Sequence, residues 1–382
     1  MQMTDYRPFG HSGLIVSPLA LGTMTFGAGR WGTDEPTARA IFDTYVEAGG
    51  NLIDTADVYS GGESEKMLGR FLKDSGLRDR MVVSTKAGFS RSEGTPMHAG
   101  NGAYNIRLGI EGSLKRLGVD RIDLYWVHVW DQLTPAEEVL RTLADAVARG
   151  EILYYGFSNA PSWYVAKIAT LARAHGLPGP IGLQYAWSLV ERGVELDIMP
   201  MAREFGLGMM PWSPLGGGLL TGKYGRDKLA AASEGATVPN AADGAEDQPR
   251  ERLNGANPYG GMLFTERNFE IVDTVRAVAG ELGVPIVQVA LAWVLQQPGA
   301  TSLLLGASKP EQLQGNLAAL SLEFTEDQRD RLNAVSALPS LNPYFIFNLP
   351  REMLFGGMQV GWARNTKASE GRFYVRPSSN VN

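Results

Sequence analysis

The sequence predicts a (β/α)8 barrel, a closed ring of eight parallel strands surrounded by helices. Short apolar runs alternate with longer segments of helical periodicity along most of the chain, as a parallel sheet with crossover helices requires. Polar residues stand at the ends of three successive apolar runs, namely Asp54, Lys86 and His128. Because the carboxyl ends of all strands in such a barrel face one mouth, these residues are expected to meet there.

The first half of the predicted barrel begins with a hairpin. Residues 6–16, with His11-Ser12-Gly13 at the centre, form this hairpin, which is expected to close the bottom of the barrel. The first barrel strand is expected at residues 19–22. Apolar residues at helical spacing between positions 38 and 46 predict a helix that ends at Gly49 and Gly50. Apolar runs within residues 51–59, 81–86 and 121–128 predict three further strands.

The second half continues the alternation. Thr134 and Glu137 form a capping-box pattern with Pro135 near the first helical position, which predicts a helix that ends before Gly150. The remaining strands are expected at residues 152–157, 181–185, 207–212 and 301–305. The remaining helices are expected at residues 163–174, 196–205, 269–282 and 286–297.

Length and composition predict one barrel domain over residues 1–340, followed by a tail over residues 341–382. The net charge of −6 is spread without a basic cluster, which argues against nucleic acid or an anionic membrane as a partner. The absence of cysteine excludes disulfides, thiolate metal ligands and a cysteine nucleophile. The N-terminal residues lack a basic segment followed by an apolar run, so we expect a cytoplasmic protein.

Two segments interrupt the barrel pattern. Residues 226–261 are rich in small and polar residues, as a mobile loop would be, and they are either surface filler or, as the family resemblance described below implies, a lid over a cofactor. The tail holds too many apolar residues to remain in water, among them Tyr344, Phe345, Phe347 and Phe355. We expect it either to roof the barrel mouth or to pack on the barrel side or a second subunit.

Asp54, Tyr59, Lys86 and His128 together form a complete apparatus for delivering a proton to a carbonyl oxygen. A tyrosine gives up its proton reluctantly at neutral pH, so a neighbouring ammonium must stabilise the phenolate, and Lys86 is expected to supply that charge. Asp54 as its partner keeps the lysine charged when it is removed from water. A neutral imidazole at His128 can donate to the substrate oxygen and hold the carbonyl in line.

Each of these four residues also has a simpler interpretation. A single polar residue in a barrel is more often a satisfied structural group than a catalyst, but four of them near strand ends favour a catalytic site. The other histidines, His11, His98 and His175, show no metal-ligand spacing, and we expect no metal site.

Phosphate binding is expected at two loops. The chain has no G-x-G-x-x-G motif after its first strand and no Walker lysine motif, whereas barrels bind phosphates after the seventh and eighth strands. Residues 212–224 hold three consecutive glycines and Lys223, so the backbone could approach a pyrophosphate. Ser308 and Glu311 form a capping-box pattern at a helix N-terminus, which also attracts anions. A flexible turn and an ordinary helix cap are the simpler interpretations.

Four segments resemble signatures of the aldo-keto reductase superfamily. They are residues 54–59 (DTADVY), 62–69 (GESEKMLG), 113–125 (SLKRLGVDRIDLY) and 156–159 (GFSN). The resemblance runs from about residue 6 to about residue 336 and is closest to the branch that holds aryl-alcohol dehydrogenases, sugar-ketone reductases and potassium-channel β subunits. It implies a barrel enzyme that uses NADP(H), with Tyr59 as the general acid.

The resemblance also implies a set of cofactor contacts. Trp212 would stack on the nicotinamide ring, and Ser308, Lys309 and Gln312 would hold the adenosine 2′-phosphate, which favours NADPH over NADH. Gly315 stands where the family usually has glutamate, so Asn316 is expected to contact the adenine alone. The other implied contacts to the nicotinamide end are Thr23, Met24, Ser158, Asn159 and Gln184, and those of the phosphate loops are Ser213, Pro214, Leu215, Gly217, Lys223 and Gly306.

We therefore predict a reversible NADPH-dependent reductase of aldehydes or ketones. One alternative is a Schiff-base lyase in which Lys86 attacks a carbonyl, against which the two phosphate loops argue. The other is a cofactor-sensing regulatory module like the potassium-channel β subunits. Those proteins have asparagine where this chain has His128, which favours an enzyme.

Aromatic residues near the predicted mouth indicate the kind of substrate. The predicted pocket residues are Phe26, Trp31 and Trp130, with Met24, Tyr104 and Trp187 as further candidates. No arginine cluster is present for a substrate carboxylate. We expect an aromatic, alicyclic or sugar-ring carbonyl.

Overall fold

The computed structural model describes residues 1–27, 32–227, 229, 253, 262–358 and 360 of the 382-residue chain. Its centre is an eight-stranded parallel sheet in the order β10-β3-β4-β5-β6-β7-β8-β9. The strands are β3 (Leu19–Gly22), β4 (Leu52–Asp54), β5 (Val82–Ala87), β6 (Ile122–Val127), β7 (Ile152–Ser158), β8 (Gly182–Gln184), β9 (Gly208–Met209) and β10 (Leu303–Gly306).

Hydrogen bonds between the two ends of this sheet close it into a barrel. At one side of β10, Leu303 lies opposite Leu19 of β3 in parallel register. At the other side, the Thr301 N–H donates to Met209 O at 2.7 Å and the Leu304 N–H donates to Pro211 O at 3.0 Å. The predicted (β/α)8 barrel is confirmed, with strands close to the predicted positions.

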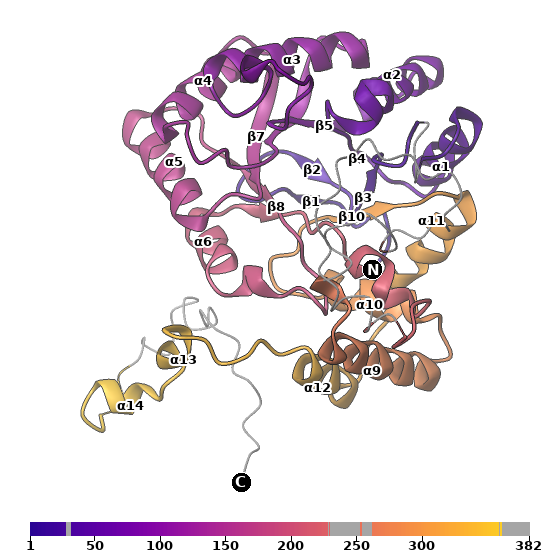
Figure 1. The fold of residues 1–382 in the computed structure, drawn as a ribbon, viewed down its shortest axis with the longest axis vertical. Coiled ribbons are helices and arrows are strands. Elements are labelled where there is room, and N and C mark those ends of the chain that lie inside the picture. The colour runs from indigo at the N-terminus through magenta and orange to yellow at the C-terminus, as the bar shows by residue number, and fades with distance from the viewer. Residues whose placement is uncertain (28–31, 228, 230–252, 254–261, 359, 361–382) are drawn as a thin grey trace.

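Helices surround the sheet on its outer side (Figure 1). They are α1 (Glu35–Glu47), α2 (Glu63–Ser75), α3 (Ala103–Leu117), α4 (Ala136–Ala148), α5 (Ser162–His175), α6 (Ile198–Phe205), α9 (Glu266–Leu282), α10 (Ile286–Leu295), α11 (Pro310–Leu317) and α12 (Glu326–Val335). Short 3-10 turns lie in several of the connections, including η1 (Tyr59–Gly62) and η5 (Gly216–Thr221).

Two predicted helix caps are wrong, because each predicted capping residue makes its side-chain hydrogen bond with another side chain instead of with the backbone of the helix. α4 begins after Pro135 without a side-chain cap, and the Thr134 hydroxyl donates to Asp131 Oδ2 at 2.5 Å instead. α11 begins after Lys309, while the Ser308 N–H and hydroxyl both donate to Gln312 Oε1 at 3.0 Å.

The N-terminal hairpin fills the barrel from below. β1 (Arg7–Pro8) pairs antiparallel with β2 (Ile15–Val16), as predicted. Phe9 in this hairpin is fully buried and contacts Trp126 edge to face, with ring centroids 6.0 Å apart. A Cβ on Gly182 would lie 2.2 Å from the Phe9 ring, so the bare glycine in β8 makes room for this plug.

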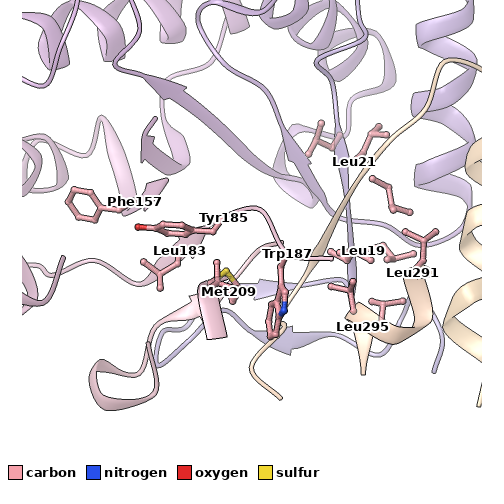
Figure 2. Packing of buried hydrophobic residues seen from close by; sticks show 14 of the residues in the cluster. Leu19, Leu21, Phe157, Leu183, Tyr185, Trp187, Met209, Leu291 and Leu295 are labelled. Carbon is pink, nitrogen blue, oxygen red and sulfur yellow. The ribbon is translucent and has the colours of Figure 1, made fainter. Parts of the chain in front are cut away.

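A second apolar layer lies between the strands and the helices. Leu19 and Leu183 from the strands and Leu291 and Leu295 from α10 belong to one buried cluster (Figure 2). Burial of such side chains from both layers is the main favourable term that holds helices against the barrel. The strand ends that carry the polar residues are thereby held in place.

The tail after α12 contains α13 (Tyr344–Phe347) and α14 (Arg351–Leu354), which stand clear of the barrel helices in Figure 1. Phe345, Phe347 and Phe355 are 47%, 51% and 43% exposed. The two predicted positions of the tail, on the barrel mouth or against the barrel side or a second subunit, remain predictions.

Most of the predicted lid, residues 226–261, lies outside the described residues. Leu253 is described, is 3% exposed, and its N–H donates to Tyr224 Oη at 3.1 Å. A Cβ on Gly217 would come within 2.7 Å of the Leu253 side chain, so this leucine lies directly on the loop after β9.

No single helix in the described part of the chain is long and apolar enough to cross a membrane. α9 and α10 meet the length and composition criteria only as a pair, which is bent by 101° at the break between them.

Candidate active site

Asp54 and Lys86 form a buried ion pair at the carboxyl ends of β4 and β5. Asp54 lies opposite Ser84 in the parallel register, and Lys86 points to the same side as Ser84 because side chains alternate along a strand. Lys86 Nζ contacts Asp54 Oδ2, and both side chains are almost completely buried. Burial lowers the pKa of Lys86, but Asp54 and Tyr59 outweigh it, so the pKa stands above its usual value. The lysine is therefore charged at neutral pH.

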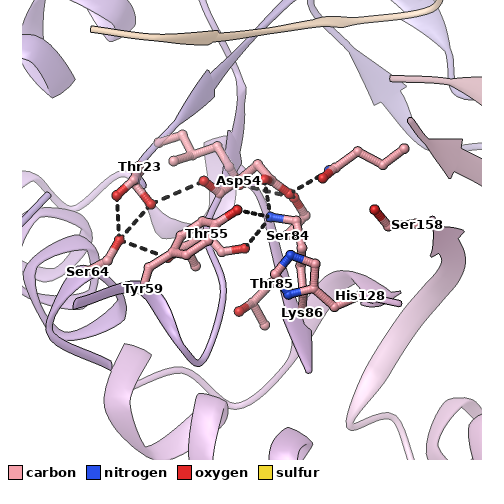
Figure 3. A network of polar contacts seen from close by, with 12 residues as sticks. Thr23, Asp54, Thr55, Tyr59, Ser64, Ser84, Thr85, Lys86, His128 and Ser158 are labelled. Atoms are coloured by element: carbon pink, nitrogen blue, oxygen red, sulfur yellow. Dashed lines mark hydrogen bonds and ion pairs between the residues drawn. The ribbon is translucent and has the colours of Figure 1, made fainter. Parts of the chain in front are cut away.

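The Asp54 carboxylate is held by side chains from two other strands, β5 and β8 (Figure 3). Its Oδ1 accepts from Ser84 Oγ at 2.6 Å and from Gln184 Nε2, at the end of β8, at 3.1 Å. The ion pair with Lys86 and these two hydrogen bonds together compensate the buried negative charge of Asp54. Gln184, predicted to hold the nicotinamide carboxamide, thus also contacts the Asp54 carboxylate.

Tyr59 begins η1, directly after the segment that follows β4. Lys86 Nζ donates to Tyr59 Oη at 3.3 Å and lies 4.8 Å from the centre of its ring. The ammonium also donates to Thr55 O at 2.7 Å, which fixes its direction (Figure 3). A charge in this place stabilises the phenolate that forms when Tyr59 loses its proton.

His128 follows β6 and faces Tyr59. Its backbone N–H donates to Ala87 O at 2.9 Å. Its imidazole ring lies edge to face with the Tyr59 ring, with centroids 6.0 Å apart. Burial, together with the Lys86 charge, lowers the pKa of His128 to about 2. The imidazole is therefore neutral at physiological pH, and its Nδ1 has no hydrogen-bond partner among the described residues.

These residues lie on the wall of a cavity of about 1300 Å³ that runs across the carboxyl ends of the strands. Asp54, Tyr59 and His128 line it directly, and Lys86 lies behind Tyr59. Every predicted cofactor residue except Thr23 also lines the cavity: Met24, Ser158, Asn159, Gln184, Trp212, Ser213, Pro214, Leu215, Gly217, Lys223, Gly306, Ser308, Lys309, Gln312 and Asn316.

The lining residues fit an extended anionic ligand such as a nicotinamide dinucleotide. In the loop after β9, Ser213, Gly217 and Gly218 have φ of 52°, 63° and 100°, so the backbone turns tightly beside the cavity. Lys223 at one part of the wall and Lys309 at the start of α11 supply positive charge. Trp212 Nε1 is buried without a hydrogen-bond partner among the described residues.

Three predicted residues lie elsewhere. Thr23 is buried and donates its hydroxyl to Asp54 O at 3.1 Å, so it supports the strand end. Phe26 is fully buried and packs edge to face on Phe71, with centroids 6.1 Å apart, and it does not line the cavity. Trp130 packs against Trp163 at 5.6 Å, also away from the cavity wall. Trp31 lies outside the described residues.

Sequence reasoning missed Phe89, which lines the cavity in the connection after β5. Its ring lies edge to face with His128, with centroids 4.7 Å apart. The available signal was a large apolar residue three positions after Lys86, just past a strand end. The wall also includes residues at the N-terminus of α1, which were not predicted: Gly32, Thr33, Asp34 and Thr37.

The described part of the chain contains no group of three or more His, Cys, Asp or Glu side chains that could hold a metal ion.

The fold and this site together define a (β/α)8 barrel with a large cavity, lined by Asp54, Tyr59 and His128, at the carboxyl ends of its strands. The chain belongs to the aldo/keto reductase family, whose model matches residues 18–337. The resemblance inferred from the sequence signatures is thereby confirmed, and the chain is an oxidoreductase of this family.

The curated relatives agree with this assignment. The chain is 38% identical over 357 residues to an aryl-alcohol dehydrogenase of Pestalotiopsis microspora, which covers 91% of this chain and 84% of that protein. It is 34% identical to norsolorinic acid reductase B of Dothistroma septosporum, over 84% of this chain and 78% of the relative. It is 31% identical to the aryl-alcohol dehydrogenase [NADP(+)] of Phanerodontia chrysosporium, over 88% of this chain and 86% of the relative.

Proposed function

We propose that this protein reduces an aldehyde or ketone with NADPH, and that it runs the reverse oxidation through the same groups. The observation that carries the proposal is the contact of the charged Lys86 with Tyr59 Oη at 3.3 Å, beside a neutral His128, on the wall of a cavity that reaches Lys309. Two relatives, an aryl-alcohol dehydrogenase and a norsolorinic acid reductase, support a reaction that interconverts a carbonyl and an alcohol.

In the proposed mechanism each of these residues has a separate task. Tyr59 Oη donates its proton to the carbonyl oxygen, and the Lys86 ammonium stabilises the phenolate that remains. Asp54 holds Lys86 in its charged state. The neutral His128 donates a hydrogen bond to the same oxygen and orients the carbonyl. The chemistry that NADPH supplies when bound is hydride donation to the carbonyl carbon.

The charged state of Lys86 also favours proton transfer over a Schiff-base lyase. A lysine must be neutral to attack a carbonyl carbon, whereas the pKa of Lys86 is raised by Asp54 and Tyr59 despite its burial. A regulatory module that only binds the cofactor would not require the neutral His128 beside Tyr59.

The direct test is NADPH consumption by the purified protein with a panel of carbonyl compounds. The panel should include an aromatic aldehyde, an alicyclic ketone and a keto-sugar, with a small charged aldehyde as the comparison. We expect turnover of the ring-bearing compounds and little of the charged aldehyde, because Phe89 and Trp212 line the cavity and the lining residues that the structure describes include no arginine cluster. Absence of turnover with every carbonyl, in both directions, would contradict the proposal.

The preference for NADPH is proposed to come from the start of α11. Ser308, Lys309 and Gln312 lie together on the cavity wall, and the Lys309 charge suits a 2′-phosphate. Lys309→Ala should weaken NADPH binding by roughly 10-fold, as expected for loss of one charge-assisted contact, with little effect on NADH. Fluorescence titration with both cofactors measures this. Equal binding of NADPH and NADH to the unmodified protein would remove the assignment.

The tail offers a further expected outcome. If residues 341–382 shape the pocket, truncation after residue 338 should preserve NADPH binding and raise KM for bulky carbonyls much more than for small ones. If they pack on a second subunit, truncation should instead change the molecular mass in solution and leave the ratio of efficiencies unchanged. Enzyme kinetics and light scattering on the truncated chain distinguish the two.

A further inference from the structure

Residues 88–102 connect β5 to α3, and Arg91 in this connection reaches inward to the segment that carries Tyr59. Arg91 Nη1 donates to Asp57 Oδ2 at 2.8 Å. Asp57 lies two residues before Tyr59, and its own N–H donates to Lys86 O at 3.0 Å. The ion pair therefore joins the connection after β5 to the short segment between Asp54 and Tyr59.

Further hydrogen bonds hold the Arg91 side chain and the connection that carries it in this position. Its Nη2 donates to Asn105 Oδ1 at 2.5 Å, and Asn105 Nδ2 in turn donates to Gly100 O at 2.7 Å. The Gly100 N–H donates to Gly88 O at 2.8 Å, which closes the base of the connection. Because both terminal nitrogens of the Arg91 guanidinium are hydrogen-bonded, the group is held rigidly against the Asp57 carboxylate.

The Asp57 side chain depends on Arg91 because it is removed from water. The residue is 3% exposed, and its Oδ1 has no hydrogen-bond partner among the described residues. The charged groups that face it from neighbouring elements are Glu65 of α2 and Arg116 of α3, and Tyr125 of β6 lies close enough to feel its charge. Loss of Arg91 would leave a buried carboxylate without its direct partner, so Asp57 would have to take up a proton or move toward water, and either change releases the segment at 57–59 from the connection after β5.

The same connection also contacts His128, the residue proposed to orient the carbonyl. Phe89 packs edge to face on His128, with centroids 4.7 Å apart. One segment between β5 and α3 therefore contacts His128 directly and Tyr59 through Asp57.

We propose that Arg91 is a positioning residue, which holds Tyr59 in its reactive place through the buried ion pair with Asp57. The inference rests on the proposed function of Tyr59 as proton donor. Arg91 does not line the cavity and has no contact with Tyr59 itself, so its effect must pass through the backbone between Asp57 and Tyr59.

The chain contains a matched control at the opposite end of the barrel. Arg78 donates to Asp123 at 2.8 Å, and the side chains of this pair are 21% and 7% exposed, against 17% and 0% for Arg91 and Asp57. Arg78 lies in η2 (Arg78–Arg80) before β5, and Asp123 lies near the start of β6, so the control pair is far from the strand ends that carry the active site. Arg78→Met and Arg91→Met should therefore cost comparable stability, and only the second should affect Tyr59.

The experiment compares kcat, KM, NADPH affinity and thermal stability of the full-length variants with NADPH and 4-nitrobenzaldehyde. Arg91→Met should lower kcat by roughly 10- to 100-fold, as a small misplacement of a reacting group does, with NADPH affinity within about twofold. Arg91→Lys should restore part of kcat because it keeps the charge. The double variant Asp57→Asn with Arg91→Met should be no slower than Arg91→Met alone, because both changes remove the same interaction.

The dependence of kcat on pH gives a readout that a purely structural role would not produce. Burial raises the pKa of Asp57 to about 6, although Arg91 opposes this. Acidification from pH 7 to pH 5 should thus protonate Asp57, weaken its ion pair and lower kcat, and Asp57→Asn should abolish this acid limb. Because the folded pKa lies above the usual 3.8, protonation of this carboxyl by itself makes the fold more stable as pH falls through this range, so titration of Asp57 would not be the cause of any unfolding. Circular dichroism at pH 5 checks that the protein stays folded while kcat is measured.

Hydrogen exchange followed by mass spectrometry tests the inference without any turnover. Exchange of residues 55–62 should increase in Arg91→Met and not in Arg78→Met. If no carbonyl is turned over, the proposed function fails. Faster exchange confined to residues 55–62 would even then show that Arg91 holds this segment in place. Unchanged kcat and unchanged exchange in Arg91→Met, with stability reduced as in Arg78→Met, would overturn the inference.

Discussion

Tyr59→Phe should lower the rate of carbonyl reduction by roughly 10²–10⁴-fold, the range typical for loss of a general acid. The substitution removes the hydroxyl group that Lys86 Nζ contacts at 3.3 Å and keeps the aromatic ring that lies beside His128. Because the lost interaction matters mainly in the transition state, kcat should carry the effect. NADPH affinity should be nearly unchanged, since Lys309 and the loop after β9 lie along other parts of the cavity wall.

Single-turnover stopped-flow measurement of NADPH oxidation separates this chemical step from product release. A suitable control is Tyr104→Phe, because Tyr104 is an exposed tyrosine on α3 that does not line the cavity. That variant should behave as the unmodified protein. A Tyr59→Phe enzyme that keeps most of its single-turnover rate would rule out Tyr59 as the proton donor.

Lys86→Met should abolish turnover and also destabilise the fold by about 3–5 kcal/mol, the cost typical of removing one partner of a buried ion pair. Asp54 would remain as a buried carboxylate whose remaining donors are Ser84 and Gln184. Urea unfolding followed by circular dichroism measures the free energy of unfolding. Arg70→Met is the surface control, because its pair with Glu35 is 43% exposed on both sides and screened by solvent, so the loss there should be small.

The double variant Asp54→Asn with Lys86→Met separates stability from catalysis. Removing both charges ends the penalty of an unpaired buried carboxylate, so part of the lost stability should return. Turnover should not return, because no ammonium then stabilises the Tyr59 phenolate. Recovery of both properties together would mean that Lys86 acts only through the stability of the fold.

The location of the candidate active site could be predicted from the sequence because it depends on simple regularities. Alternating apolar runs and helical stripes predicted the positions of the strands and the common mouth, and Asp54, Lys86 and His128 stood at or near strand ends where the fold brings them together. The glycines after β9 and the residues from Ser308 to Asn316 followed from the same rule, since loops after strands seven and eight share that mouth. These features are local, and the barrel only assembles them.

Only the tertiary structure decided which side chains of each loop face the cavity. Phe26 and Phe89 are both aromatic residues just after a strand, yet Phe26 is buried against Phe71 and Phe89 contacts His128. The path of a loop depends on contacts with other elements, and its sequence has no regular period that would reveal the direction of a side chain.

The pairing of Asp57 with Arg91 was hidden for a related reason. Arg91 is one of many charged residues in the sequence, and an ion pair across 34 positions depends on how two connections fold over the same strand ends. The sequence by itself determined the fold, the family and the four residues proposed for catalysis. The tertiary structure determined how those residues are supported, because support comes from contacts between segments that are distant along the chain.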